Sequence, residues 1–133
     1  MARLLLVDVL SNDIRNTVKE VECNELEDYY RHLHCDCFDI ANRKVGNSRY
    51  DIFVDDIGLF AEDPLVSAVR ITDDAGYEPM LVGNLIFANH DSEGNTTDLT
   101  NEDIVNIKEH IIVAARSDSE GNMKLQAVVE LDY

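Results

Sequence analysis

The chain has 133 residues, of which 45% are hydrophobic, and 27 acidic side chains outnumber 11 basic ones to give a formal net charge of -16 at pH 7. The length predicts one domain that buries a core without disulfides, and no apolar run reaches the roughly 18 residues of a transmembrane helix. The acidity disfavours direct binding of DNA or RNA, because it repels phosphates, and it favours a protein partner with a basic surface.

The charge has a second explanation, because a strongly acidic surface also keeps a protein soluble without any partner. Acidic residues occur in nearly every segment and form no tail, so we expect a folded acidic surface rather than a disordered one. Residues 1–9 are too short, and acidic too soon, for a secretory signal. We therefore expect a cytoplasmic protein with no membrane contact.

The first elements are predicted to be strands. Residues 2–9, A-R-L-L-L-V-D-V, are short and mostly apolar, which is typical of a central strand buried on both faces. After a turn at residues 11–13, residues 14–21 alternate imperfectly with charged residues, which favours an edge strand. A sheet is therefore expected to begin at the start of the chain.

A helix is predicted to open the stretch 24–37, N-E-L-E-D-Y-Y-R-H-L-H-C-D-C. Asn24 can accept a hydrogen bond from the Glu27 amide while the Glu27 carboxylate reaches back, which is the pattern of a capping box. An apolar stripe with helical spacing, which we expect to pack on the sheet, is formed by Leu26, Tyr29, Tyr30 and Leu33.

The middle of the chain is predicted to be mostly strand. Residues 37–45 predict a strand, which a turn at residues 46–48 ends. Residues 50–55 alternate in polarity, and after residues 55–58 the apolar run resumes at residues 59–60, which indicates a hairpin or a bulged strand. Residues 64–71 can form a strand or a short helix that begins at Pro64, and the apolar spacing slightly favours the helix. Residues 80–88, M-L-V-G-N-L-I-F-A, predict one buried central strand with Gly83 at a bulge or close packing point.

The last part of the chain predicts a helix and a hairpin. Thr100 is suited to cap a helix whose buried stripe is Ile104, Ile107 and Ile111. Residues 112–115 and 123–131 then form a hairpin around a D-S-E-G-N turn. The predicted fold class is α+β, a single domain over residues 1–133 with a mixed, mostly antiparallel sheet packed by two short helices.

Five motifs carry a resemblance to a known family: L-L-V-D-V, L-x-x-Y-Y-x-H-L, Y-D-I-F-V-D-D-I-G-L, L-V-G-N-L-I-F-A and D-L-T-N-E-D-I. Over residues 3–112 the chain resembles a family of small acidic proteins of unknown function carried by phages and mobile elements of Gram-positive bacteria. The motifs are structural, and no active-site residues come with them. The resemblance implies a mobile-element context, in which small proteins that disarm host defences, anti-CRISPR proteins among them, are frequent.

Soft metal ligands are dense at one place only, where His32, His34, Cys35 and Cys37 fall within six positions. Cys35 and Cys37 on a strand would point to one side, and a turn could bring either histidine beside them, so we predict a structural zinc ion bound by these four residues. Cys23 lies about 15 Å away along the helix and is a poor ligand. The alternative is that the cysteines are small core residues and the histidines lie on the surface.

Three cysteines, two of them in C-x-C, suit thiolate or metal chemistry better than a disulfide framework. A Cys–His nucleophile is formally available from the same cluster, but no oxyanion motif, phosphate loop or nucleophile elbow accompanies it. We therefore expect that the protein is not an enzyme.

The expected function is that of an anti-defence inhibitor which occupies a basic, nucleic-acid-handling surface of a host effector, such as a Cas nuclease, and blocks nucleic-acid loading. The alternative is a small metal-dependent enzyme or ligand-binding module acting on a host metabolite or signalling nucleotide. A cleft with converging polar groups would favour the alternative. The residues predicted to bind the partner are Glu25, Glu27, Asp28, Asp55, Asp56, Glu62 and Asp63.

Overall fold

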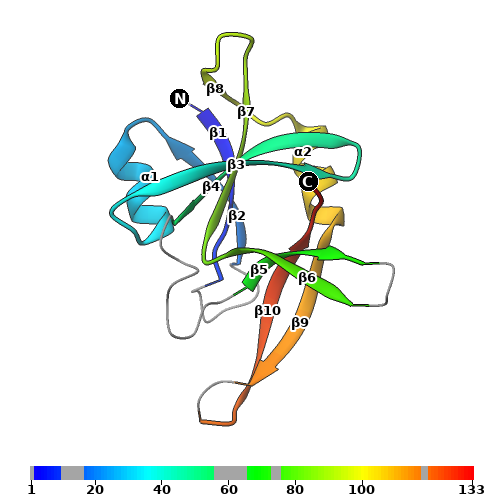
Figure 1. Ribbon diagram of the computed structural model, residues 1–133. Coiled ribbons are helices and arrows are strands. Elements are labelled where there is room, and N and C mark those ends of the chain that lie inside the picture. The colour runs from blue at the N-terminus through cyan, green and yellow to red at the C-terminus, as the bar shows by residue number, and fades with distance from the viewer. Residues whose placement is uncertain (1, 10–16, 56–65, 73–75, 118–119) are drawn as a thin grey trace.

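The computed structural model describes residues 2–9, 17–55, 66–72, 76–117 and 120–133, which form strands in two sheets and two short helices (Figure 1). The predicted α+β fold class is confirmed. The elements are β1 (Ala2–Val7), β2 (Val18–Cys23), α1 (Leu26–Leu33), β3 (Phe38–Val45), β4 (Ser48–Asp55), β5 (Val66–Ile71), β6 (Tyr77–Val82), β7 (Leu85–His90), β8 (Thr96–Thr97), α2 (Asn101–Glu109), β9 (Ile111–Ser117) and β10 (Met123–Glu130).

The first sheet, sheet A, has the antiparallel strand order β2-β1-β7-β4-β3, with β8 added beside β7. β1 is central, as predicted, and its apolar run is buried on both faces because Leu4 and Leu6 point one way while Leu5 and Val7 point the other. β2 lies at the edge, also as predicted, although the described strand begins at Val18 and residues 14–16 lie outside the described residues.

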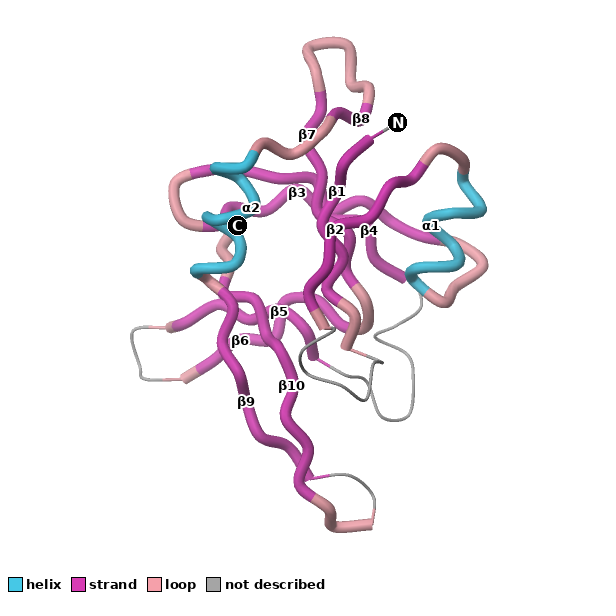
Figure 2. The backbone as a smooth tube through the Cα atoms, turned by 180° about the vertical axis from the view of Figure 1, so that it is seen from behind, coloured by secondary structure: helices cyan, strands magenta, loops and turns pink. Residues whose placement is uncertain are grey.

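The second sheet, sheet B, has the strand order β6-β5-β10-β9. Its pairs are antiparallel except for β5 and β10, which run parallel. The predicted C-terminal hairpin is confirmed as β9 and β10, whose far end extends away from the rest of the molecule in both Figure 1 and Figure 2. The prediction of a single sheet was incomplete, because it did not separate these four strands from sheet A.

The two faces of sheet A are covered differently (Figure 2). α1 packs on one face through Tyr29 and Leu33, against Leu4, Leu6, Phe53 and Ile86. α2 and the inner face of sheet B cover the other face, where Tyr50 and Phe87 meet edge to face with ring centroids 6.4 Å apart. Sheet A is therefore the middle layer of the fold.

α1 begins one residue later than the sequence predicts. Its N-cap is Glu25, and the carboxylate of Asp28 accepts hydrogen bonds from the main-chain N–H groups of Asn24 and Glu25, at 2.8 and 3.1 Å. Asp28 therefore takes the role in the capping box that the sequence predicts for Glu27. Leu26 of the predicted stripe is 56% exposed, because the first turn projects beyond the sheet.

α2 begins as predicted, with Thr100 as the N-cap and Asp103 completing a capping box. The carboxylate of Asp103 also accepts hydrogen bonds from Tyr50 Oη at 3.0 Å and Asn89 Nδ2 at 2.9 Å. Asn106, one turn later, donates to Tyr50 Oη and to the Val45 carbonyl. This polar network ties the helix to the middle of sheet A.

Two predictions in the middle of the chain were wrong. Within residues 64–71, the described part, β5, is a strand of sheet B and not a helix. Residues 80–88 form parts of two strands in different sheets, β6 and β7, and the chain changes sheets at Gly83, where φ is +75°. The next residue, Asn84, is buried and donates from Nδ2 to Asp8 and to the His32 carbonyl, which holds this connection in place.

β10 joins the two sheets where it ends. The Leu131 N–H donates to the Val69 carbonyl in sheet B at 2.9 Å. Asp132 then exchanges two main-chain hydrogen bonds, of 2.9 and 2.8 Å, with Lys44 on the outer edge of β3. This antiparallel bridge, together with a hydrogen bond of 2.9 Å from Arg49 Nη2 to the Tyr133 carbonyl, joins the end of sheet B to sheet A.

Candidate functional site

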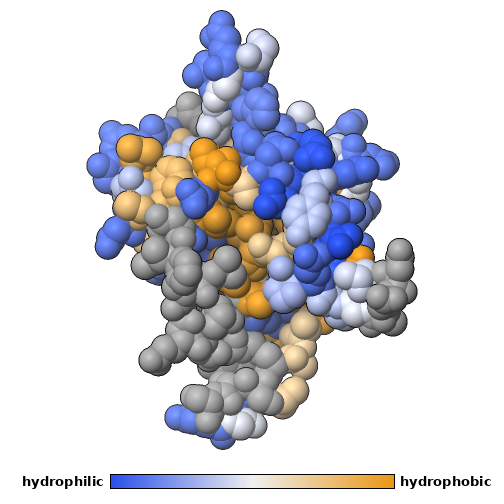
Figure 3. Space-filling view, in the orientation of Figure 1, coloured by the Kyte–Doolittle hydropathy of each residue, from blue (hydrophilic) through white to orange (hydrophobic). Residues whose placement is uncertain are grey.

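A groove lies between β3, an edge strand of sheet A, and β6, an edge strand of sheet B, and we call it the edge groove. It has a volume of about 390 Å³ and is lined by residues 39–43 of β3, 54–55 of β4 and 80–82 of β6. Figure 3 shows apolar side chains gathered in the middle of this face, between the positions of β3 and β6 in Figure 1. The groove therefore has two strand edges as walls and a largely apolar floor.

The two ends of the edge groove carry opposite charges. Asp39 and Asp55 lie at the end where β3 begins, since Asp55 pairs with the first residue of that strand. Arg43 lies at the other end, where its guanidinium stacks on the ring of Tyr133, 5.5 Å from the centroid. Arg43 Nη1 donates to the Asn42 carbonyl at 2.9 Å, while its buried Nε has no hydrogen-bond partner in the structure.

Tyr133 closes the basic end of the groove. Its ring is held between Arg43 and Arg70, and its hydroxyl donates to Glu78 Oε1 at 2.9 Å. Hydrogen bonding to Glu78 raises the pKa of Tyr133, so this side chain stays neutral and keeps its proton on the donating oxygen. Sequence reasoning missed this stack, because its members are far apart in the chain and no motif links them.

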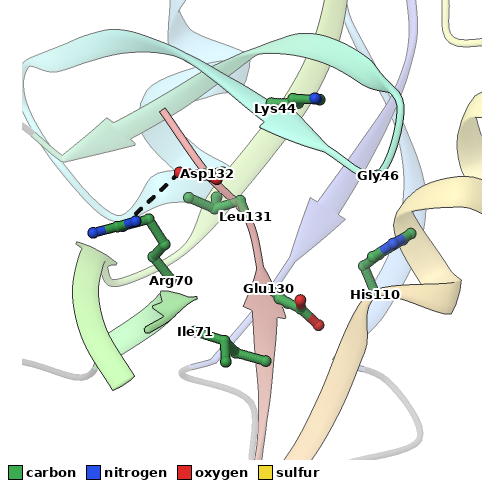
Figure 4. Close-up of a pocket in the computed structure, with 8 residues that line it drawn as sticks. All are labelled: Lys44, Gly46, Arg70, Ile71, His110, Glu130, Leu131 and Asp132. Atoms are coloured by element: carbon green, nitrogen blue, oxygen red, sulfur yellow. Dashed lines mark ion pairs between the residues drawn. The ribbon is translucent and has the colours of Figure 1, made fainter. Parts of the chain in front are cut away.

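A small polar pocket lies where α2, the β3–β4 turn and the end of β10 meet (Figure 4). The ring of His110 points toward Gly46, and Nδ1 donates to the Asn106 carbonyl at 2.7 Å, which leaves Nε2 as the second ring nitrogen facing the pocket. Arg70 on the opposite side pairs with Glu78 at 2.8 Å and with Asp132 at 3.8 Å. The volume is about 200 Å³, below the roughly 300–1,000 Å³ of ordinary small-molecule sites.

The outer face of sheet B is hollowed and apolar. Its hollow of about 530 Å³ is lined mainly by valine, isoleucine and tyrosine side chains from β5, β6, β9 and β10, among them Val66, Tyr77, Ile112 and Val128. Tyr77 is 65% exposed. The described lining of this hollow can contact another apolar surface.

The predicted partner-binding residues fall on two elements. Glu25 and Glu27 are exposed at the start of α1, and Asp55 lies in the edge groove. Asp28 is committed to the cap and to an ion pair with Arg31, and hydrogen bonds from the Asn24 and Glu25 main chain lower its pKa. The other three predicted residues, Asp56, Glu62 and Asp63, lie outside the described residues.

Of the predicted zinc ligands, His32 lies in the last turn of α1, and His34, Cys35 and Cys37 lie in the connection to β3, which begins only at Phe38. His34 is the exposed C-cap of α1, Cys37 is exposed, and Cys35 packs partly against the aromatic cluster under α1. Burial, followed by the charges of Arg31 and Lys19, lowers the pKa of His32, which favours the neutral imidazole that binds metals.

Within the part of the chain that the structure describes, no three His, Cys, Asp or Glu side chains are grouped as a metal site. Zinc binding therefore stays a prediction. Cys23 is buried against α1, and burial together with the charge of Asp28 raises the pKa of its thiol to about 11, which disfavours the thiolate that zinc requires.

Comparison with known proteins gives a family and no function. No curated protein and no solved structure matches the chain. Among the described helices, none is both long and apolar enough to cross a membrane. The family match spans residues 5–112, which includes both helices and the strands from β4 to β8. The chain belongs to the DUF3846 family, a domain of unknown function.

Proposed function

We propose that this protein is a binding module that occupies a basic, nucleic-acid-handling surface of a partner protein and inhibits it, as an anti-CRISPR protein inhibits a Cas nuclease. The observation that carries the proposal is the excess of carboxylates over cations in a folded domain, 27 against 11. Four of those cations, Arg3, Lys19, Arg31 and Arg70, already pair with carboxylates of the same chain. The remaining acidic side chains supply long-range attraction to a basic surface.

Acidic residues around α1 form the surface we assign to this role. Glu22 on β2, Glu25 and Glu27 on α1, and Asp36 and Asp39 beyond it are all exposed. Glu25, Glu27 and Asp36 lie in α1 and its flanking turns, on the face of sheet A that α1 covers, whereas Glu22 and Asp39 belong to the two edge strands of that sheet. The small volume of the polar pocket at His110 supports this role over the alternative of an enzyme acting on a metabolite or nucleotide.

The test uses purified CRISPR nucleases, with and without guide RNA, and measures both the dissociation constant and target cleavage. Binding should weaken at least tenfold as salt rises from about 0.05 to 0.3 M, because the attraction between exposed charges is screened. Glu25→Lys with Glu27→Lys should weaken binding at least tenfold. The matched control is Glu102→Lys with Glu109→Lys, which reverses two exposed charges on α2 instead.

Equal loss in the two double variants would mean that only net charge matters and that the α1 surface has no special role. Failure to bind or inhibit any nuclease in a panel that covers the major effector types would overturn the proposal. A gel-shift experiment completes the set, since tight binding of free DNA or RNA at low salt would contradict the expected repulsion.

We propose in addition that zinc braces the end of α1 through Cys35, Cys37 and one or both of His32 and His34. The support is that these residues follow one another from the last turn of α1 into the connection to β3, where His34 and Cys37 are exposed. Elemental analysis of protein expressed with zinc should find about one ion per chain, and Cys35→Ser with Cys37→Ser should abolish it. The zinc proposal would be overturned if the protein contained no metal and the double substitution left the melting temperature unchanged.

A further inference from the structure

We infer that the edge groove docks an extended peptide segment of the partner, which adds to β3 as an antiparallel strand and places a lysine or arginine beside Asp39. This inference rests on the proposed function and deepens it, because it states which part of the partner is bound and by which atoms. Strand addition to an exposed sheet edge is a general mode of peptide recognition.

The outward hydrogen-bonding groups of β3 follow from its turn. β3 and β4 are joined by the two residues Gly46 and Asn47, and Val45 pairs with Ser48. In such a hairpin the closing pair exchanges main-chain hydrogen bonds, and alternate residues of the strand then point their N–H and C=O groups away from the partner strand. Val45, Arg43, Ala41 and Asp39 therefore face β4, while Lys44, Asn42 and Ile40 face outward.

One position on the outer edge of β3 is already paired with another segment of the same chain. Lys44 is the first outward-facing residue, and its N–H and C=O are both bound by Asp132 in an antiparallel bridge. Asn42 and Ile40 are the next outward-facing positions along the same edge, and they line the groove. A segment that continues the direction set by Asp132 needs no rearrangement of β3 to pair with them.

The floor of the groove suits the side chains of such a strand. Ala41 and Val54 of sheet A face the groove, and Met80 on the opposite wall is partly buried. Ile40, 55% exposed, points to the other face of β3, where the next side chain of an added strand would lie. Leu81 and Val82 behind them belong to the core and hold the wall rigid. An extended strand with apolar residues at alternate positions would cover this surface.

The ends of the groove orient the segment and define its charge. An antiparallel segment begins near Arg43 and ends near Asp39, so its basic side chain is expected in its C-terminal half. A second copy of this chain is the weaker occupant, because it would bring another net charge of -16 to an acidic site.

The test selects displayed random peptides of about 12 residues for binding to the intact protein. Enriched peptides should alternate apolar residues and carry lysine or arginine in the C-terminal half. When bound, they should slow hydrogen exchange of the Ile40 and Asn42 amides at least tenfold. Protection of amides on β9, or of no amide, would overturn the inference, as would failure to enrich any peptide or self-association in place of peptide binding.

One position offers a matched pair of variants. Asn42→Pro removes the outward N–H without touching the hydrogen bonds to β4, and it should weaken peptide binding at least tenfold. Asn42→Ala removes the same side-chain contacts, to Asp51 and Arg49, but keeps the N–H, and it should bind within about twofold of the wild type. Equal binding by the two variants, each folded by circular dichroism, would overturn the inference.

The charged end has its own variant, and the outcome separates this inference from the proposed function. Asp39→Lys should weaken binding of the selected peptides at least tenfold, and unchanged binding would overturn the predicted basic residue. Glu25→Lys with Glu27→Lys should leave peptide binding unchanged. Peptide binding without nuclease inhibition would overturn the proposed function but support peptide docking in the groove. Inhibition that survives Asn42→Pro would overturn peptide docking in the groove but support the proposed function.

Discussion

In the described part of the chain, both faces of sheet A are covered, whereas the outer face of sheet B is exposed. In β7 of sheet A, Leu85, Ile86 and Phe87 are fully buried, because α1 lies over one face and α2 with sheet B over the other. In sheet B the inner face is buried, while Tyr77 and Val113 are more than half exposed. Sheet A is therefore the scaffold of the fold, and the outer face of sheet B is an apolar surface that can contact another molecule.

The largest expected effect tests the scaffold. Phe87→Ala should lower the free energy of unfolding by about 3–5 kcal/mol, because it opens a cavity beside Tyr50 in a fully buried layer. Val113→Ala in sheet B should change it by less than about 0.5 kcal/mol, since that side chain is largely in solvent. Urea denaturation measures both, and similar losses would mean that sheet B has no free face.

Substitution of one turn glycine in each sheet compares how tightly the two turns are packed. Both Gly46 in sheet A and Gly121 in sheet B have positive φ, so alanine at either should cost about 1 kcal/mol in strain. At Gly46 the new Cβ would also lie 2.6 Å from Asn106 Oδ1 and 2.8 Å from His110 Cε1, whereas at Gly121 it meets open space. Gly46→Ala should therefore cost about 2 kcal/mol or more. Thermal unfolding that ranks the two variants equally would contradict the packing of this turn against α2.

The polar network of sheet A predicts a pH dependence. Burial opposes the ionisation of Asp103, but hydrogen bonds from Thr100, Asn89 and Tyr50 outweigh it and lower its pKa. The stabilisation is complete above the unfolded pKa, about 3.9, and is lost as the pH falls toward the lowered folded value. Asp103→Asn should cost about 1–2 kcal/mol at neutral pH and should lose less stability than the wild type below about pH 4. Parallel pH profiles for the two proteins would exclude this role.

The smallest expected effect is on amide hydrogen exchange and not on the free energy of unfolding. In the protein without peptide, the amides of Ile40 and Asn42 should exchange faster than those of Ala41 and Arg43, because only the latter pair donates to β4. Residue-resolved hydrogen exchange measures the difference. A uniform rate along these four residues would mean that a further segment already covers the edge of β3.

The sequence predicts elements best where a local signal marks their ends. Thr100 followed by acidic residues marks the start of α2, and the D-S-E-G-N turn marks the C-terminal hairpin. The apolar run 80–88 has no such signal for a change of sheet. Parts of two buried strands have the same apolar composition as one buried strand. The sequence therefore predicts a single strand with Gly83 inside it, where the structure has a change of sheet.

The candidate site is harder to predict, because it is made by tertiary contacts. Acidic residues near α1 could be expected to lie on the surface, and Glu25 and Glu27 do. The edge groove, in contrast, exists only because the end of β10 reaches Lys44 and sets β6 opposite β3. No pattern of residue spacing in the sequence predicts that arrangement of β3 and β6.

The bridge between Asp132 and Lys44 also has a consequence for the order of assembly. β10 is made after the other described strands, yet it lies inside sheet B, where it pairs with β5 as well as β9. Sheet B can therefore close only when residues 123–130 have left the ribosome, and the long loops that must close first slow folding. Until then β5 and β6 present apolar surface and unpaired edges, so a nascent chain that stalls before residue 123 should depend on chaperones.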